Sequence, residues 1–210
     1  MKTGFDKLDN IIHDMKNDKI LLIASRPGTG KTTLAIDITN NVAKETDKPV
    51  LYFSLESLKK YLEPRFLSDN IEIITGHPSI TSIHLISEKM YRKYGGLSLI
   101  VVDYLQLIKS GISDETFDYT RKKIIEILHH IAVMLNVPVI VLSQLSSLDN
   151  EDYYLKIKDY SSYISNILLL YREVYDDQLK IKVIDNTGVS YGSVGLTFNE
   201  EMLSFEEIAE

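Results

Sequence analysis

A glycine-containing segment after an early apolar run carries the residues whose types and spacing most clearly suggest chemistry. It follows the run 20–24 and reads Ser25-Arg26-Pro27-Gly28-Thr29-Gly30-Lys31-Thr32-Thr33. Glycines let successive backbone N–H groups point into one concavity, and a helix N-terminus adds partial positive charge where a β-phosphate would lie. The order of strand, loop and helix therefore predicts a P-loop, whose nine residues bind a nucleoside triphosphate.

Two side chains of this P-loop have separate predicted roles. Lys31 would reach the β- and γ-phosphates, and the Thr32 hydroxyl would bind Mg²⁺. The usual pattern G-x-x-x-x-G-K-[ST] is broken only at its first position, which is Ser25 here. A small residue at that position need only fit a tight turn, so we expect the loop to form. The alternative interpretation is a glycine-rich turn that binds nothing.

Three further polar residues, Glu56, Asp103 and Gln144, come at the ends of later apolar runs. We expect Asp103 to hold Mg²⁺ directly or through water, and Glu56 to orient and deprotonate the attacking water. Gln144 would contact the γ-phosphate. Each residue also has a plainer interpretation: Asp103 could cap a turn, Glu56 could be a solvated residue at a helix N-terminus, and Gln144 could simply end a strand.

The hydrophobic pattern predicts the elements that position these residues. Helices are expected over residues 5–16, 31–44, 58–68, 79–94 and 117–135, the fourth of them capped by Ser79 and closed at Gly95-Gly96. Apolar strands are expected over 20–24, 49–55, 71–74, 97–103 and 138–144. Later strands are expected over 167–171, 178–185, 192–198 and 203–205, all antiparallel. The predicted fold class is α/β, with a mostly parallel central sheet, helices on both faces and an antiparallel C-terminal extension.

Composition and charge limit the class of protein. The 210 residues are 44% hydrophobic and 25% charged, which is typical of one globular domain with a sizeable core. No apolar run has the length of a membrane span and no signal core is seen, so we expect a cytoplasmic location and no membrane partner. The absence of cysteine excludes disulfides and thiolate metal sites. A net charge of −7 disfavours general affinity for nucleic acid, but is compatible with a local basic groove.

The candidate residues and their neighbours together resemble the RecA-like C-terminal ATPase domain of DnaB-type replicative helicases. The matching segments are Thr3-Gly4-Phe5 with Leu8-Asp9, Ala24-Ser25-Arg26-Pro27, Gly30-Lys31-Thr32, Phe53-Ser54-Leu55-Glu56, Gly95-Gly96-Leu97, Asp103-Tyr104-Leu105-Gln106-Leu107, Leu135-Asn136-Val137-Pro138-Val139-Ile140, Ser143-Gln144-Leu145 and Tyr171-Arg172-Glu173. The resemblance covers nearly the whole chain. It implies a single domain over 1–210, divided into an N-terminal helix (1–16), a parallel βα core (17–145), a shortened DNA-loop region (146–162) and C-terminal strands (163–210).

The resemblance also implies an activity. A protein of this family is expected to be a hexameric ATPase that uses ATP and Mg²⁺, moves along single-stranded DNA and acts in DNA replication. Glu56 would be its catalytic base. Helicases of this type also carry an N-terminal domain and a linker helix, whereas this sequence begins at the Thr3-Gly4-Phe5 segment. Both a hexamer and docking on another replication protein therefore stay open.

Two other departures from the family pattern bear on activity. The family has a basic Lys-x-Arg-Asn-Gly run where this sequence has Ile184-Asp185-Asn186-Thr187-Gly188. Loss of an arginine finger costs about 10³–10⁵ in turnover in related hydrolases, so slow hydrolysis is expected unless Lys180 or Lys182, or less favourably Arg172, replaces it. The segment 146–160 holds four acidic residues and two basic ones, which predicts weak binding of single-stranded DNA.

Two other functions are compatible with the same residues. The chain could be a nucleotide-switched adaptor or regulator of a replicative helicase, without unwinding activity of its own. A small-molecule kinase is disfavoured, because no base for an acceptor and no lid is evident in the sequence.

Overall fold

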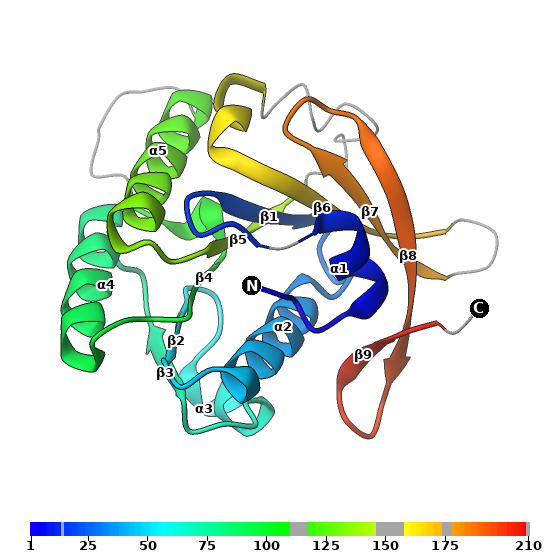
Figure 1. The fold of residues 1–210 in the computed structure, drawn as a ribbon, viewed down its shortest axis with the longest axis horizontal. Coiled ribbons are helices and arrows are strands. Elements are labelled where there is room, and N and C mark those ends of the chain that lie inside the picture. The colour runs from blue at the N-terminus through cyan, green and yellow to red at the C-terminus, as the bar shows by residue number, and fades with distance from the viewer. Residues whose placement is uncertain (14, 110–116, 146–157, 174–177, 209–210) are drawn as a thin grey trace.

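The protein is organised around a mixed β-sheet (Figure 1). A computed structural model describes residues 1–13, 15–109, 117–145, 158–173 and 178–208. In these residues the sheet has nine strands in the order β3-β2-β4-β5-β1-β6-β7-β8-β9. The strands are β1 (Ile20–Ser25), β2 (Val50–Ser54), β3 (Ile71–Thr75), β4 (Leu99–Asp103), β5 (Val139–Gln144), β6 (Ile164–Arg172), β7 (Leu179–Asp185), β8 (Ser190–Asn199) and β9 (Ser204–Glu207).

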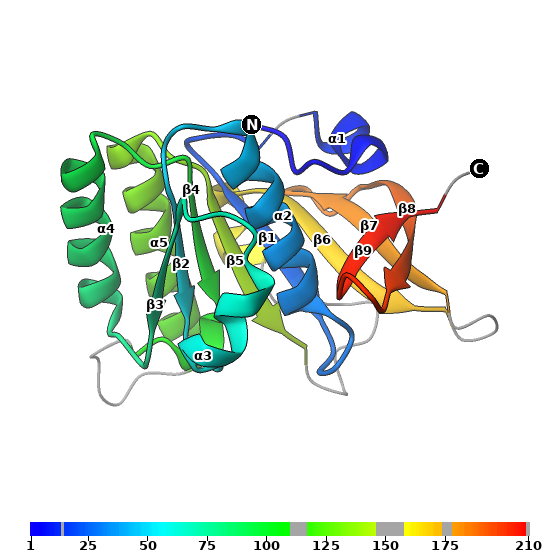
Figure 2. The same cartoon turned by 90° about the horizontal axis from the view of Figure 1, so that it is seen from below.

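Helices cover both faces of the parallel part of the sheet (Figure 2). One face carries α4 (Ile80–Tyr94) and α5 (Phe117–Leu135), and the other carries α1 (Asp6–Ile12) and α2 (Lys31–Glu45). The short helices that connect the larger elements are α3 (Lys59–Leu62), η1 (Glu63–Arg65), η2 (Leu105–Leu107) and η3 (Lys158–Tyr163). This layering gives the strands two buried faces.

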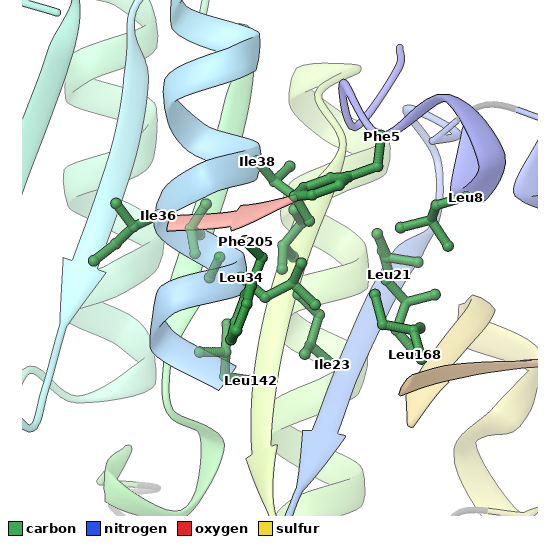
Figure 3. Close-up of a cluster of buried hydrophobic side chains, with 14 of the residues drawn as sticks. Phe5, Leu8, Leu21, Ile23, Leu34, Ile36, Ile38, Leu142, Leu168 and Phe205 are labelled. Atoms are coloured by element: carbon green, nitrogen blue, oxygen red, sulfur yellow. The ribbon is translucent and has the colours of Figure 1, made fainter. Parts of the chain in front are cut away.

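Two hydrophobic cores, one on each face, explain the continuous apolar runs in the sequence. In β1, Leu22 packs in the core under α4 and α5, whereas Leu21 and Ile23 pack in the core under α1 and α2. Successive side chains of a strand point to opposite faces, so a strand covered on both sides must be apolar at every position. Figure 3 shows the second core, in which Leu34 of α2 and Phe205 of β9 lie with the strand residues.

The ends of α4 confirm the prediction made from its capping residues. The Ser79 hydroxyl accepts a hydrogen bond from the backbone N–H of Ser82 at 3.1 Å, as an N-cap does. Gly95 follows the last turn in the left-handed conformation, with φ 64°, and donates its N–H to the carbonyl of Tyr91. The expected bounds of α5 are also confirmed.

The direction of β6 differs from the prediction. This strand was expected to be antiparallel, but it pairs in parallel with β1, from Ile20↔Ile164 to Ser25↔Leu170. The chain must cross β1 to travel from β5 to β6, and η3 lies in that crossover, which returns the strand in the same direction. The antiparallel part begins only with β7.

Two predicted helices are shorter than expected. The helix predicted over 58–68 consists of α3 followed by η1, and Phe66 already has an extended backbone. Pro64 lacks the N–H that an α-helix interior needs, which favours the tighter turn. The helix predicted over 5–16 ends at Ile12, and His13 follows with a positive φ of 62°.

The hairpin of β8 and β9 packs against α2 and the P-loop. The backbone N–H of Phe205 donates to Asp37 Oδ2 at 2.8 Å. A Cβ atom added at Gly30 would lie 2.6 Å from Cζ of Phe205, and the φ of Gly30 is +109°, so both space and backbone require glycine. Arg65 donates to Thr33 Oγ1 at 3.1 Å and to the carbonyl of Leu203 at 3.0 Å. The hairpin thus supports the P-loop from behind.

Asp37→Asn should stabilise the protein at neutral pH. Burial raises the pKa of Asp37 to about 6, against the opposing effects of the Phe205 N–H and Arg65. Between pH 3.8 and about 6 the unfolded carboxyl ionises before the folded one, so this group lowers stability as pH rises through that range. An asparagine keeps an oxygen for Phe205 without the buried charge. We expect a gain of about 1 kcal/mol, because partial screening reduces the full effect of the shift.

Denaturant unfolding of both proteins at pH 4 and pH 7.5 measures this difference. The variant and the wild type should be nearly equally stable at pH 4, and the variant should be the more stable at pH 7.5. A variant that is less stable than the wild type at pH 7.5 would contradict the assignment.

Candidate nucleotide site

The predicted site residues lie at one edge of the sheet, where the parallel strands end. The register pairs Ser54 with Asp103 across β2 and β4, and Ser25 with Gln144 across β1 and β5. Glu56 follows β2 at the same edge. Because parallel strands place their carboxyl ends together, residues far apart in sequence meet here.

The P-loop bridges the end of β1 and the first turn of α2. Ser25 is buried, and Arg26 accepts hydrogen bonds at its carbonyl from the hydroxyls of Ser25 and Thr29, at 2.8 and 2.9 Å. Gly28 and Gly30 have positive φ values of 74° and 109°. Arg26, Pro27 and Gly28 are exposed, and the residues half-buried beyond them are Thr29, Gly30, Lys31, Thr32 and Thr33. The departure at Ser25 therefore leaves a closed turn.

The carboxylate of Asp103 connects the P-loop to two strands. Its Oδ2 accepts hydrogen bonds from the hydroxyls of Thr32 at 2.9 Å and Tyr52 at 3.1 Å. Asp103 is only 3% exposed, and its Oδ1 is buried with no hydrogen-bond partner among the described residues. Burial raises the pKa of Asp103, the bonds from Thr32 and Tyr52 lower it, and Glu56 and Lys31 act in opposite directions. The two oxygens of this carboxylate are therefore satisfied to different degrees.

Lys31 lies within electrostatic reach of both acidic candidates. Burial lowers the pKa of its ammonium group, while the charges of Asp103 and Glu56 raise it. Glu56 itself is exposed. The edge therefore holds a partly desolvated cation beside a buried and an exposed carboxylate, which suits a ligand that carries both negative charge and a bound cation.

The donor set at Thr32 and Asp103 fits Mg²⁺. This hard cation prefers oxygen ligands and is usually held by one or two protein oxygens together with phosphate and water. Such oxygens are supplied by the Thr32 hydroxyl and by Asp103 Oδ1, to which no described residue donates. In the described part of the chain, no group of three or more His, Cys, Asp or Glu residues could hold a metal. The residues therefore fit a cation that is shared with a phosphate ligand.

Tyr52 is a site residue that the sequence interpretation missed. Its side chain is fully buried, and burial, followed by the nearby Asp103, raises its pKa well above the usual value, so that it stays a neutral donor. One signal was available in the sequence, since a tyrosine within an apolar strand must find a partner for its hydroxyl. Gln106 was part of a quoted motif, but no role was assigned to it.

The turn after β7 lies far from the P-loop of the same chain. Asp185 pairs with Asn166, near the start of β6, at the edge opposite to the P-loop. Its carboxylate accepts hydrogen bonds from the N–H groups of Thr187 and Val189, both at 2.8 Å, and from the Tyr191 hydroxyl at 3.0 Å. Any action of this turn on a nucleotide would therefore concern another copy of the chain.

The residues named as substitutes for an arginine finger have different surroundings. Lys180 forms an ion pair with Glu173 at 3.0 Å. Lys182 lies further along β7, opposite Leu169. Arg172 lies two residues beyond Leu170, the partner of Ser25, and is therefore near the P-loop edge. The acidic loop of the sequence interpretation lies mostly outside the described residues.

No helix in the described part of the chain is both long and apolar enough to cross a membrane.

Comparisons with known proteins agree with this architecture. The family described as DnaB-like helicase C terminal domain matches residues 1–78 and 73–156. The replicative DNA helicase DnaB of Pasteurella multocida is 30% identical, in an alignment that covers 100% of this chain and 56% of that protein. The chain thus spans little more than half of that relative's length.

Two solved structures resemble the fold. One, described as the ATPase domain of another protein, has a TM-score of 0.85 at 23% identity, over 99% of this chain and 91% of that chain. A DnaB-like replicative helicase, described with its interactions with primase, has a TM-score of 0.83 at 24% identity, over 99% of this chain and 63% of that chain. These similarities establish a RecA-like arrangement with a parallel core and antiparallel C-terminal strands.

Tyr52→Phe should destabilise the protein, because it removes one of the two hydroxyl donors to a buried carboxylate. We expect a loss of ~1–3 kcal/mol in the free energy of unfolding, since a buried acceptor is left less well satisfied. Tyr61→Phe is the matched control, since Tyr61 is 65% exposed, and it should change stability by less than about 0.5 kcal/mol. Equal stability of the two variants in denaturant unfolding would argue against the role of the Tyr52 hydroxyl.

Proposed function

Because the chain belongs to the DnaB-like helicase C-terminal domain family, we propose that it binds ATP with Mg²⁺, hydrolyses the ATP and acts as the motor domain of a DNA helicase in replication. The observation that carries the proposal is the contact of Thr32 with Asp103 at 2.9 Å, beside an Asp103 Oδ1 that has no partner among the described residues. Lys31 and Glu56 at the same edge support it.

Each side chain has a role that its position allows. The P-loop backbone and Lys31 bind the phosphates and neutralise the charge that develops on them. Thr32 and Asp103 would hold Mg²⁺, which supplies further neutralisation of the phosphoryl oxygens when bound. Glu56, exposed after the end of β2, orients the attacking water and takes its proton. Gln144, opposite Ser25, contacts the γ-phosphate.

Single-stranded DNA and partner subunits extend the proposal beyond one chain. A hexamer would place the Asp185 turn of one copy near the nucleotide of another, since that turn lies at the edge opposite to its own P-loop. The related helicase described with primase makes a replication protein of that kind a candidate partner. Turnover in such an assembly is expected to be slow, because no arginine stands in the 184–188 segment. The proposed location is the cytoplasm.

A nucleotide-switched adaptor is the second candidate. Asp185 favours it, because its carboxylate is used to close its own turn and carries the charge opposite to that of an arginine finger. ATP turnover and solution mass, each with and without single-stranded DNA, separate the two functions. DNA-stimulated turnover by a large assembly supports the motor, whereas a nucleotide-bound monomer without stimulation supports the adaptor.

Lys31→Ala should abolish measurable ATP binding. The ammonium group contacts the part of the ligand that carries most of its charge, and charge-assisted hydrogen bonds are the strongest polar contacts in such a site. Titration with a fluorescent ATP analogue measures the affinity. Lys44→Ala, at an exposed position near the end of α2, is the control and should bind as the wild type does. Tight binding by Lys31→Ala would remove the P-loop assignment.

Glu56→Gln should keep nucleotide bound while turnover stops. The amide has the shape of the carboxylate but cannot accept the proton of the attacking water, and general-base catalysis contributes about 10²–10⁴-fold. Phosphate release and nucleotide affinity are measured on the same preparation. Glu200→Gln, at an exposed position after β8, should leave both unchanged. Wild-type turnover in Glu56→Gln would show that the base is another residue.

A further inference from the structure

Strands β4 and β5 separate before they reach the nucleotide edge. They lie side by side in the sheet (Figure 2), and their pairing runs from Ile100↔Val139 to Val102↔Val141. On its other side, β5 stays paired with β1 as far as Ser25↔Gln144. After Asp103 the chain turns into η2 instead of continuing beside β5. Within the described residues, the end of β5 therefore lacks a neighbouring strand on the β4 side.

The side chain of Gln106 takes the place of the missing strand. Its Oε1 accepts from the Gln144 N–H at 3.2 Å, and its Nε2 donates to the Gln144 carbonyl at 2.8 Å and to Ser143 Oγ at 3.1 Å. The next N–H, that of Leu145, donates to Ser25 on the β1 side at 2.8 Å. A glutamine amide offers the same donor and acceptor as a peptide group, so it satisfies both backbone groups of Gln144.

These contacts have consequences for the site, because both ends of the connection belong to it. Gln106 follows Asp103 by one short turn, and Gln144 lies opposite the first residue of the P-loop. We propose that Gln106 is a positioning residue, which holds the end of β5 so that the Gln144 side chain faces the phosphates in fixed register with Asp103. This inference rests on the proposed function, in which Gln144 contacts the γ-phosphate.

A change in the hydrogen bonding of Gln106 tests the proposal. Gln106→Met keeps the length of the side chain and removes its amide. We expect kcat for ATP to fall about 10- to 100-fold, as small displacements of reacting groups can cause, while KM changes less than about twofold because the P-loop is untouched. Ser143→Ala removes only the third contact and serves as the control, with kcat near that of the wild type. Unchanged kcat in Gln106→Met would overturn the proposal.

A double-mutant cycle separates positioning from general stability. If Gln106 acts through Gln144, then Gln106→Met should lower kcat in the wild type but not further in Gln144→Ala. A purely structural role would lower the melting temperature and leave kcat unchanged below it. Losses that multiply in the double variant would show that the two residues act independently, contrary to the proposal.

Hydrogen exchange tests the contact without relying on catalysis. In Gln106→Met the amide of Gln144 should exchange faster than in the wild type, whereas that of Leu145, which donates to Ser25, should stay protected. Unchanged exchange at Gln144 would overturn the proposal even if the chain hydrolyses ATP. A wild-type chain that binds no ATP would instead refute the proposed function, while the exchange result still decides whether Gln106 holds β5.

Discussion

The buried carboxylate of Asp103 is the group on which the arrangement of the nucleotide edge depends. A carboxylate in a low-dielectric interior is costly unless hydrogen bonds or a cation compensate it. The hydroxyls of Thr32 on α2 and Tyr52 on β2 provide part of that compensation. Since the three residues come from separate elements, their mutual contact fixes the position of the P-loop helix relative to β2 and β4.

The same carboxylate makes the edge receptive to a ligand. Its Oδ1 is buried without a partner among the described residues, and burial raises its pKa. A cation beside that oxygen would relieve a cost that the folded protein already bears. Lys31, whose own pKa is lowered by burial, lies close enough to be affected by Asp103 and Glu56. The stability of the unliganded fold and its affinity for a phosphate-bound cation are therefore opposed at this point.

Local sequence signals predicted the elements better than the contacts between them. The hydroxyl of Ser79 and the permissive backbone of Gly95 act within a few residues, so the ends of α4 followed from the sequence. The meeting of Asp103 with Thr32 followed from the geometry of parallel strands. The direction of β6 did not, because apolar periodicity is the same for parallel and antiparallel strands.

Side-chain contacts across the sheet were missed for a different reason. The bonds of Tyr52 to Asp103 and of Gln106 to Gln144 depend on strand register and on where β4 and β5 separate, and neither is encoded in the spacing of residue types. Both residues were visible as polar groups within or next to apolar strands. Their partners became identifiable only in three dimensions, where each buried donor or acceptor must be accounted for.

The contact of β9 with the P-loop has a consequence for synthesis of the protein. Phe205 packs against Gly30, and its N–H binds Asp37, which lies 168 residues earlier in the chain. A nascent polypeptide therefore contains the glycine turn long before the strand that supports it has left the ribosome. It follows that the growing chain cannot form the complete phosphate loop, and that affinity for nucleotide is acquired only in the last stage of translation.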